Sequence, residues 1–549
     1  MDKQRVLLIH PLGYDARVAG RDISRLANLM PPLGLAGIAA YVEQYGFHAD
    51  IIDCFADPDS DRVIDDYVRR YQPGYVGATC TTAGFLDVAR IFGRIKQMRP
   101  ETCTVAGGPH VSALRDTIVR DYEEVDYVVV GEGEGPLRSL MESGGRPEGI
   151  AGLAYRDGGQ IAFNGFQDNR LNLDTLPLPA YHKLAGFPQR YQLPIFNYPK
   201  TPNASCISSR GCPYQCSYCD RSVFRRSFRY NSADYLVQHL SHLRKQFGIR
   251  HINFYDDQFT FHRDRVVAFC ERMIEHPMGM TFNCAVRAEH VDPGLLALMK
   301  RAGCWMISLG IETGDPDLLA QHRQNPDLEL MAEAVRRIHR AGIRVKGLLM
   351  IGLPGETERS FRRTMDYVFS LPIDDLNMAK FTPFPGSPLY EKIHELGSFE
   401  ENWEKMDCMN TVFVPHGMTA EQLNEVTAFR DYWANLDSEI GADYVHDSWD
   451  CRDLLHHQVE DVYDRTFWQP VHNAWMAAQS RQDRGKVRRE GKPKNTKKRR
   501  ELKPVEKAVW RRLYKGETRA QIARELGVTR QAVHSTIQRI KRVRSQAGP

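Results

Sequence analysis

The sequence has 549 residues, and its hydrophobic content of 42% is ample for buried cores, which excludes a disordered chain. At roughly 100–200 residues per domain, this length predicts about three or four domains. No run of about 18 apolar residues occurs, which excludes a membrane-spanning helix. The N-terminal segment MDKQRVLLIHPLGYD is predicted to be a first strand rather than a signal peptide, so we expect a cytoplasmic protein.

The formal net charge of +4 hides an asymmetry along the chain. Residues 481–549 hold 23 lysines and arginines but 6 acidic residues, whereas the preceding residues carry a net negative charge. An acidic body with a basic tail suggests that the tail meets a polyanion.

Residues 1–140 alternate short apolar runs with amphipathic stretches. The expected strands are Arg5–His10, Ala49–Asp53, Tyr75–Thr81, Cys103–Gly107 and Tyr127–Gly131, and the expected helices cover about 34–45, 61–71, 86–98 and 113–122. Strands that alternate with helices predict an α/β fold, here a doubly wound, Rossmann-like parallel sheet with helices on both faces. Ligands of such sheets bind at the carboxyl ends of the strands.

Residues 141–200 are rich in proline and glycine and are predicted to be a connector. Residues 201–400 again alternate strands with helices, and the expected strands lie at 204–208, 250–255, 281–286, 304–310, 345–351 and 376–382. Six such strands predict a partial parallel barrel, a (β/α)6 version of the TIM barrel, with catalytic residues at the carboxyl ends of its strands.

The remaining residues are expected to be helical or disordered. We expect a helical extension over 401–480 and a basic, disordered linker over 481–502. Residues 503–549 are expected to form a small domain of three short helices.

Three of the twelve cysteines lie close together in the segment GCPYQCSYC. Cys212, Cys216 and Cys219 form a CxxxCxxC spacing directly after an expected strand, and the other nine are scattered. Three thiolates on one tight loop can hold three irons of a four-iron cluster and leave the fourth iron open for a substrate group. A zinc site completed by Cys206 or His251 is the alternative, although zinc sites more often use paired ligand spacings.

The sequence resembles the radical S-adenosylmethionine superfamily, and within it the methylase-like members that carry an N-terminal cobalamin-binding domain. The resemblance covers residues 4–400. The matching segments are PPLGLAGIAAYVEQYGF, VAGGPHVSA, YVVVGEGEGPL, SSRGCPYQCSYC, FYDDQFTF, CAVRAE, LGIETGD, MIGLPGET and FTPFPGSPLYE. This resemblance implies a [4Fe-4S] cluster on the three cysteines, S-adenosylmethionine bound to its open iron, and cobalamin.

The resemblance also implies contacts with S-adenosylmethionine at the ends of the barrel strands. Tyr218 would lie near the adenine, and Asp256 and Asp257 would lie near the methionine end, where many members have Gly-Gly-Glu instead. Further contacts are implied for Arg287, Glu312, Gly352, Leu353 and Pro354. For a single arginine or glutamate, a structural ion pair is the alternative.

The implied cobalamin site lies at the strand ends of the first domain. Glycines let a bulky flat group approach the backbone, and threonine hydroxyls can hydrogen-bond its polar rim. The expected residues are Thr79, Thr81, Thr82, Gly107, Gly108, Gly131 and Glu132. In the Asp-x-His-x-x-Gly motif of other cobalamin proteins an aspartate orients the histidine that binds cobalt. Here Leu8 replaces that aspartate, so we expect His10 to structure a turn or face solvent.

Together the two modules predict methyl transfer to an unactivated carbon of a small-molecule substrate, with flavodoxin or ferredoxin as the reducing partner. Oxidative cyclisation or rearrangement is an alternative, since related members catalyse these reactions. A second alternative is a regulatory protein that senses cobalamin or redox state and binds DNA through its tail.

Residues 503–549 resemble the helix-turn-helix of sigma factor region 4. Thr518 would begin the second helix, and Gly527 would form the turn. The residues expected to face the major groove of duplex DNA are Arg530, Gln531, His534 and Ser535. A solvated three-helix appendage is the alternative.

Overall fold

The structure is a computed structural model, and it describes residues 2–13, 30–57, 59–168, 171–191, 198–424 and Arg524. The chain divides into two compact units, Met1–Thr427 and Ala428–Pro549, and the sheets and helices with described bounds belong to the first. The expected linker at 481–502 and the expected DNA-contacting residues Arg530, Gln531, His534 and Ser535 lie outside the described residues.

A seven-stranded sheet forms the N-terminal part of the first unit, in the order β2-β1-β3-β4-β5-β6-β7. Its strands are β1 (Asp2–His10), β2 (His48–Asp53), β3 (Pro73–Thr79), β4 (Cys103–Gly107), β5 (Tyr127–Val129), β6 (Leu153–Asp157) and β7 (Gln160–Phe163). The first five strands pair in parallel, which confirms the expected doubly wound sheet. β6 and β7 add antiparallel pairs, so the expected connector is wrong for this segment.

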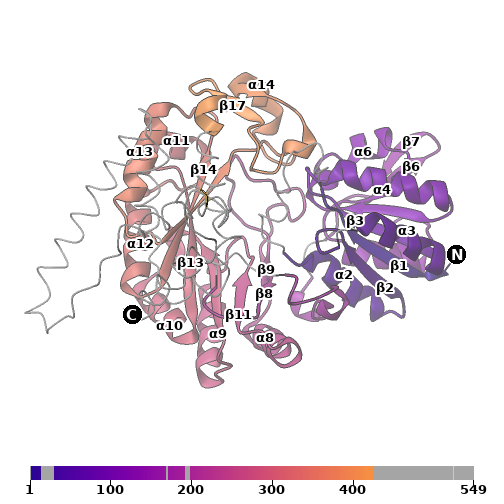
Figure 1. The fold of residues 1–549 in the computed structure, drawn as a ribbon, viewed down its shortest axis with the longest axis horizontal. Coiled ribbons are helices and arrows are strands. Elements are labelled where there is room, and N and C mark those ends of the chain that lie inside the picture. The colour runs from indigo at the N-terminus through magenta and orange to yellow at the C-terminus, as the bar shows by residue number, and fades with distance from the viewer. Residues whose placement is uncertain are drawn as a thin grey trace, which may run out of the picture. The chain divides into compact units, whose positions relative to one another are not determined.

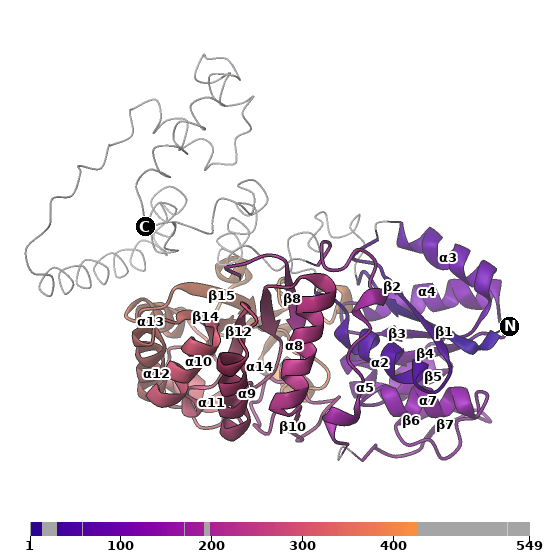
Figure 2. The same ribbon diagram turned by 90° about the horizontal axis from the view of Figure 1, so that it is seen from below.

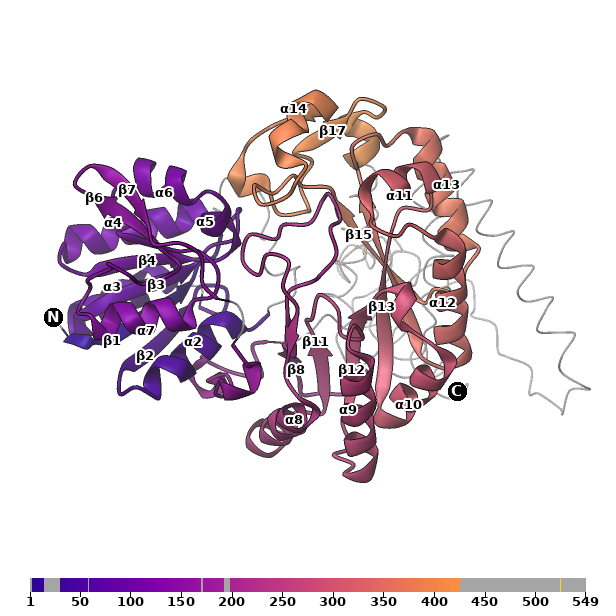
Figure 3. The same cartoon turned by 180° about the vertical axis from the view of Figure 1, so that it is seen from behind.

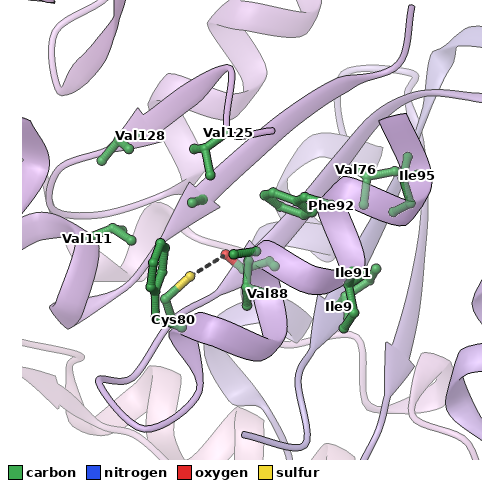
Figure 4. Packing of buried hydrophobic residues seen from close by; sticks show 14 of the residues in the cluster. Ile9, Val76, Cys80, Val88, Ile91, Phe92, Ile95, Val111, Val125 and Val128 are labelled. Carbon is green, nitrogen blue, oxygen red and sulfur yellow. Dashed lines mark hydrogen bonds between the residues drawn. The ribbon is translucent and has the colours of Figure 1, made fainter. Parts of the chain in front are cut away.

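Helices cover both faces of this sheet, as Figure 2 shows for α3 and α4 on one side and α2 and α7 on the other. The helices are α2 (Leu33–Glu43), α3 (Ser60–Tyr71), α4 (Phe85–Met98), α5 (Pro109–Ala113), α6 (Arg115–Asp121) and α7 (Glu134–Glu142). Along β1 the side chains alternate, so that Leu7 and Ile9 join the core under α3 and α4 while Leu8 faces α2 and α7. Figure 4 shows this core around Phe92, which is fully buried.

A six-stranded parallel sheet follows, in the order β15-β14-β13-β12-β11-β8. Its strands are β8 (Asn203–Cys206), β11 (His251–Phe254), β12 (Thr281–Val286), β13 (Cys304–Glu312), β14 (Arg344–Ile351) and β15 (Asp375–Lys380), which confirms all six expected strands. Six helices lie outside it (Figures 1 and 3). They are α8 (Ala233–Phe247), α9 (Arg263–Glu275), α10 (Pro293–Ala302), α11 (Pro316–His322), α12 (Leu328–Arg340) and α13 (Glu358–Phe369). This arrangement is the expected partial barrel.

Two short antiparallel pairs complete the first unit. β9 (Ser209–Arg210) pairs with β10 (Arg229–Tyr230), and β16 (Gly397–Phe399) pairs with β17 (Phe413–Pro415). A helix α14 (Ile393–Leu396) lies beside the second pair, and a 3-10 turn at Trp403–Lys405 packs against α4. The expected helical extension is therefore wrong for residues 401–415, because Phe413 packs its strand into the apolar cluster around Leu353 and Phe381.

The helices of the described residues include none that is both long and apolar enough to cross a bilayer.

Candidate functional site

The cysteine loop begins where β9 ends. Gly211 has a φ of +85°, and a side chain there would collide with the carbonyl oxygen of Ser227. Only glycine adopts this conformation without strain, so Gly211 sets the sharp turn into Cys212. The three cysteines then occupy the segment between β9 and β10.

The middle of this loop is tied to two other strand ends through His322, the last residue of α11. The carbonyl oxygen of His322 accepts a hydrogen bond from the backbone N–H of Ser217 at 2.9 Å. Its ring Nε2 lies 2.7 Å from the carbonyl oxygen of Pro354, and its Nδ1 lies 2.9 Å from the Ser217 hydroxyl. Because a carbonyl can only accept, Nε2 carries the proton and Nδ1 accepts from Ser217. Burial lowers the pKa of His322, which favours this neutral form.

A guanidinium lies beside the thiols. Arg287, directly after β12, places Nη1 3.7 Å from Sγ of Cys216 and its charge 3.8 Å from the ring centre of Tyr214. Glu289 holds the same guanidinium at 2.7 Å. A nearby cation stabilises thiolate charge. Cys216 itself is buried, Cys212 is half-buried and Cys219 is exposed.

The chemistry of this donor set fits a four-iron cluster. In the part of the chain that the structure describes, no three His, Cys, Asp or Glu side chains converge as the ligands of a single metal ion would. A four-iron cluster binds each cysteine through a different iron, so its three thiolates need not converge on one point. Three thiols on one turn, with an arginine to offset their charge, match that requirement. Cys212, Cys216 and Cys219 are therefore the residues that would hold the cluster.

Tyr218 and Glu312 meet beside this loop. The hydroxyl of Tyr218 is hydrogen-bonded to the carboxyl of Glu312, whose pKa is raised by burial although Arg323 and this bond act against the rise. Glu312 ends β13 with a φ of +63°, a conformation that strains a residue with a side chain. Such strain occurs where a side chain must be aimed at a site. Tyr218 and Glu312 therefore lie together, and their contact with S-adenosylmethionine stays a prediction.

The two consecutive aspartates after β11 have different surroundings. Asp256 is 4% exposed, and its carboxylate accepts hydrogen bonds from the backbone N–H groups of Ser208 and Ser209 at 2.6 and 3.1 Å. Arg265 lies 3.9 Å away, and burial raises the pKa of Asp256. The expectation that Asp256 contacts S-adenosylmethionine is corrected, because its oxygens hold the turn before the cysteine loop. Asp257 is exposed and raises the pKa of the Cys212 thiol, in addition to the larger effect of burial.

The turn Gly352–Pro354, expected to contact S-adenosylmethionine, forms an apolar wall beside Tyr218 rather than a set of polar ligands. Gly352 has a φ of +83°, and its N–H donates to the carboxylate of Glu356. Leu353 is fully buried in an apolar cluster against which Tyr218 packs. The carbonyl of Pro354 holds His322, so this turn positions both Tyr218 and the cysteine loop.

A cavity of 280 Å³ lies between the N-terminal sheet and the helices α2 and α7. Its walls hold glycines from both sides, including Gly34 and Gly37 of α2 and Gly77 of β3. A Cβ atom at Gly77 would lie 3.0 Å from the Leu8 side chain, and one at Gly133 would lie 2.6 Å from Ile38. Side chains at these positions would fill the slot. A narrow, mainly apolar slot of this kind fits the flat nucleotide base of cobalamin.

Five of the seven expected cobalamin residues line this cavity: Thr79, Gly107, Gly108, Gly131 and Glu132. Thr81 and Thr82 are not among the residues lining this cavity, and their contact with cobalamin stays a prediction. Thr81 accepts a hydrogen bond from the N–H of Gly84, the residue before α4, at 3.2 Å. Thr82 is 4% exposed and lies 3.3 Å from Nδ1 of His110 on the opposite side of the strand end.

A group of four charged residues, which we call the Arg210 cluster, joins two sheets beside this cavity: the two-stranded β9–β10 sheet and the seven-stranded sheet, through the turn between β5 and α7. Arg210 lies 2.7 Å from Glu132 and 2.6 Å from Glu134, and Arg229 lies 2.8 Å from Glu132. Burial alone would raise the pKa of Glu132, but the two arginines hold it below its ordinary value. Glu132 therefore lines the cavity with a carboxylate that is already paired. Arg210, Arg229 and Glu134 were not predicted, because their partners are about 80 or more residues away in sequence.

His10 is oriented by an aspartate, although not by the one in the usual motif. Its Nδ1 lies 2.9 Å from the carboxylate of Asp53, which ends the neighbouring strand β2. Asp53 thus orients the histidine ring, as the aspartate of the motif does at the position that Leu8 occupies here. His10 is not among the residues lining the 280 Å³ cavity.

Comparison with known protein families finds both modules. The Radical SAM superfamily matches residues 206–368, which span the cysteine loop and strands β11 to β14. The B12 binding domain matches residues 22–141, which carry the glycine-lined cavity. The chain therefore combines a Radical SAM domain with a B12 binding domain. It is an enzyme, and its cofactors are a [4Fe-4S] cluster, S-adenosylmethionine and cobalamin.

Several known proteins match most of the chain. An uncharacterized methyltransferase of Pyrococcus horikoshii is 28% identical over 78% of this chain and 91% of its own length. The anaerobic magnesium-protoporphyrin IX monomethyl ester cyclase of Rubrivivax gelatinosus is 26% identical over 78% of each chain. The structure of the radical S-adenosylmethionine methyltransferase TsrM from Kitasatospora setae, solved with cobalamin and a [4Fe-4S] cluster, has a TM-score of 0.59. It covers 87% of this chain and 100% of its own at 16% identity, and so supports the fold.

Proposed function

We propose that this enzyme catalyses cobalamin-dependent methyl transfer from S-adenosylmethionine to an unactivated carbon of a small molecule, in a cytoplasmic, reducing environment. One observation carries the proposal. The 280 Å³ cavity of the N-terminal sheet is also lined by Ser209, Tyr255 and Asp257 from the strand ends of the barrel. The cobalamin cleft therefore opens beside the cysteine loop, so one substrate carbon can face both cofactors.

When bound, the reduced cluster would supply the one-electron cleavage of S-adenosylmethionine to a carbon radical, and cobalamin would supply a methyl carrier. The residues of the chain bind, orient and exclude water. Cys212, Cys216 and Cys219 would hold the cluster, and Arg287 offsets thiolate charge. Tyr218 and Glu312 would contact S-adenosylmethionine, with Asp257 at the mouth of the cleft.

The apolar wall around Leu353 and Phe381 shields this side of the barrel from solvent. Exclusion of water matters because a carbon radical is consumed by side reactions in an open site. A one-electron donor such as flavodoxin or ferredoxin would supply the reducing equivalent.

The test is anaerobic turnover with methyl-labelled S-adenosylmethionine, cobalamin and a reductant. We expect the parent protein to form a labelled product together with 5′-deoxyadenosine. Cys216→Ala should abolish both, while Cys103→Ala, a half-buried cysteine of β4, should leave both unchanged. Formation of 5′-deoxyadenosine with an unlabelled product would contradict methyl transfer and favour oxidative cyclisation, the activity named for the Rubrivivax relative.

We further propose that residues 503–549 bind duplex DNA, with contacts from Arg530, Gln531, His534 and Ser535. The support is the basic charge of residues 481–549 and their resemblance to a helix-turn-helix. Electrophoretic titration of the full chain with duplex DNA over a range of salt tests this. A basic tail alone would bind every sequence equally and lose its affinity steeply with salt. Binding no better than that of a chain with residues 481–549 scrambled would contradict the proposal.

A further inference from the structure

A second cavity, of about 730 Å³, lies next to the cobalamin cleft and is unusually rich in arginine. It is lined by Ser112 of α5, by Phe166 to Asp168 after β7, by the segment that follows the last cysteine, and by Pro385 and Gly386 after β15. Arg221, Arg225 and Arg226 all lie in that segment, against one acidic side chain, Asp168. Since the chain before residue 481 is acidic overall, this local excess of positive charge is a specific feature of the cavity.

The three arginines of this cavity form no salt bridges with the described residues. In the described part of the chain, none of the three has a carboxylate within salt-bridge distance; Arg225 and Arg226 are exposed to solvent, whereas Nη1 of Arg221 is buried without a hydrogen-bond partner. A buried, unpaired guanidinium nitrogen costs free energy unless a ligand completes it. Arg225 stacks its guanidinium 4.3 Å over the ring of Phe166 and has a φ of +57°, so it is held at the wall at the expense of backbone strain.

The cavity adjoins the chemistry on two sides. Phe224 lines both this cavity and the cobalamin cleft. Gly386 approaches the carboxylate of Asp220 so closely that a side chain at Gly386 would collide with it. Asp220 stands between Cys219 and Arg221 in the chain, so the wall of the cavity touches the end of the cysteine loop.

From these observations we propose that the cavity binds an oxyanion group, phosphate or carboxylate, of the methyl acceptor. This inference rests on the proposed function and specifies its substrate class. Guanidinium groups match both anions with paired N–H donors, and three of them suit a group with more than one negative charge. A volume of about 730 Å³ is the size of a small-molecule site rather than of a flat protein-docking surface. Binding the anion here would place the rest of the substrate towards Phe224 and the cobalamin cleft.

The test uses the anaerobic holoenzyme and calorimetric titration with inorganic pyrophosphate and, separately, citrate. Arg221→Gln/Arg226→Gln removes two charges at the cavity. Arg250→Gln/Arg301→Gln removes two charges at exposed positions outside it and is the matched control. We expect the first pair to weaken binding by about tenfold to a hundredfold, which corresponds to loss of one or two charged hydrogen bonds, and the control to bind like the parent. The stronger of the two probes identifies the anion as phosphate or carboxylate.

Several results would overturn the proposal. One is the absence of saturable binding of either probe by the parent, and another is equal affinity in the two double variants. Loss of cobalamin content in Arg221→Gln/Arg226→Gln with unchanged pyrophosphate affinity would assign the cavity to the corrin. The variant Arg221→Gln/Arg226→Gln could also cleave S-adenosylmethionine more slowly with flavodoxin but not with dithionite, at unchanged pyrophosphate affinity. That result would assign the arginines to binding of the electron-donor protein. If pyrophosphate affinity falls as expected but no substrate is ever methylated, the anion site stands and the proposed function fails alone.

Discussion

Replacement of Arg210 by glutamine tests whether the Arg210 cluster holds the two sheets together. The guanidinium is bonded to Glu132 at 2.7 Å and to Glu134 at 2.6 Å, and both carboxylate side chains are 9% exposed. Removing one partner of a buried ion pair costs about 3–5 kcal/mol, because a charge is left buried and unpaired. Glu132 keeps Arg229, and Arg210 is itself 20% exposed. We therefore expect Arg210→Gln to lower the free energy of unfolding by about 2–4 kcal/mol.

The pH dependence of this loss has a defined sign. The arginines hold the pKa of Glu132 below its ordinary value of 4.5, so the ionised carboxylate is favoured by folding. That contribution is fully present above the ordinary pKa and is lost as the pH falls through the lowered pKa. The difference between Arg210→Gln and the parent should therefore be constant at neutral pH and shrink below about pH 4.

Urea titration of the apoprotein, with cobalamin uptake measured afterwards, is the assay. Arg62→Gln is the control, because Arg62 pairs with Asp59 and Asp66 while 67% exposed and should cost less than about 1 kcal/mol. Adding Glu134→Gln to Arg210→Gln should recover part of the loss, since a neutral amide is less costly to bury than a carboxylate. If Arg210→Gln has the stability and the cobalamin uptake of the parent, the cluster does not join the two sheets.

Two buried side chains and one glycine give three further predictions. Burial raises the pKa of Glu356 to about 8, so its contribution to stability is lost as the pH rises from about 4.5 to 8. The thermal midpoint of Glu356→Gln relative to that of the parent should therefore be higher at pH 8 than at pH 5. An unchanged difference between the two proteins would contradict this. Burial lowers the pKa of His110 to about 4, so stability falls as pH drops from 6.5 towards 4, and His110→Gln should flatten that slope in urea titrations at pH 7 and 5. Gly108→Ala places a Cβ 2.7 Å from the carbonyl oxygen of Cys80 at a φ of +108°, so it should lower the free energy of unfolding by about 2–4 kcal/mol and reduce cobalamin uptake. Gly93→Ala lies in open space on α4 and should raise the free energy of unfolding by about 0.5–1 kcal/mol. Equal effects of the two substitutions would refute the steric argument.

The expected sheets could be predicted because their signals are local. Each buried parallel strand is a short apolar run followed by an amphipathic helix, and this periodicity survives whatever the run pairs with. The CxxxCxxC spacing is equally local, since all three thiols lie on one turn. The hairpin of β6 and β7 escaped prediction because both strands are short, β7 is only partly buried, and the pairing of β6 with β5 depends on the rest of the sheet.

The sequence by itself determined the two modules, their cofactors and the cysteines that would hold the cluster. Tertiary structure alone decided which of two neighbouring residues faces the site. Asp256 holds a turn while Asp257 faces the 280 Å³ cavity, and Thr79 lines that cavity while Thr82, three residues further on, meets His110. Adjacent side chains of an extended segment point to opposite sides, and what lies on each side comes from distant parts of the chain. The Arg210 cluster has the same origin, because charges far apart in sequence become partners only when the two sheets pack.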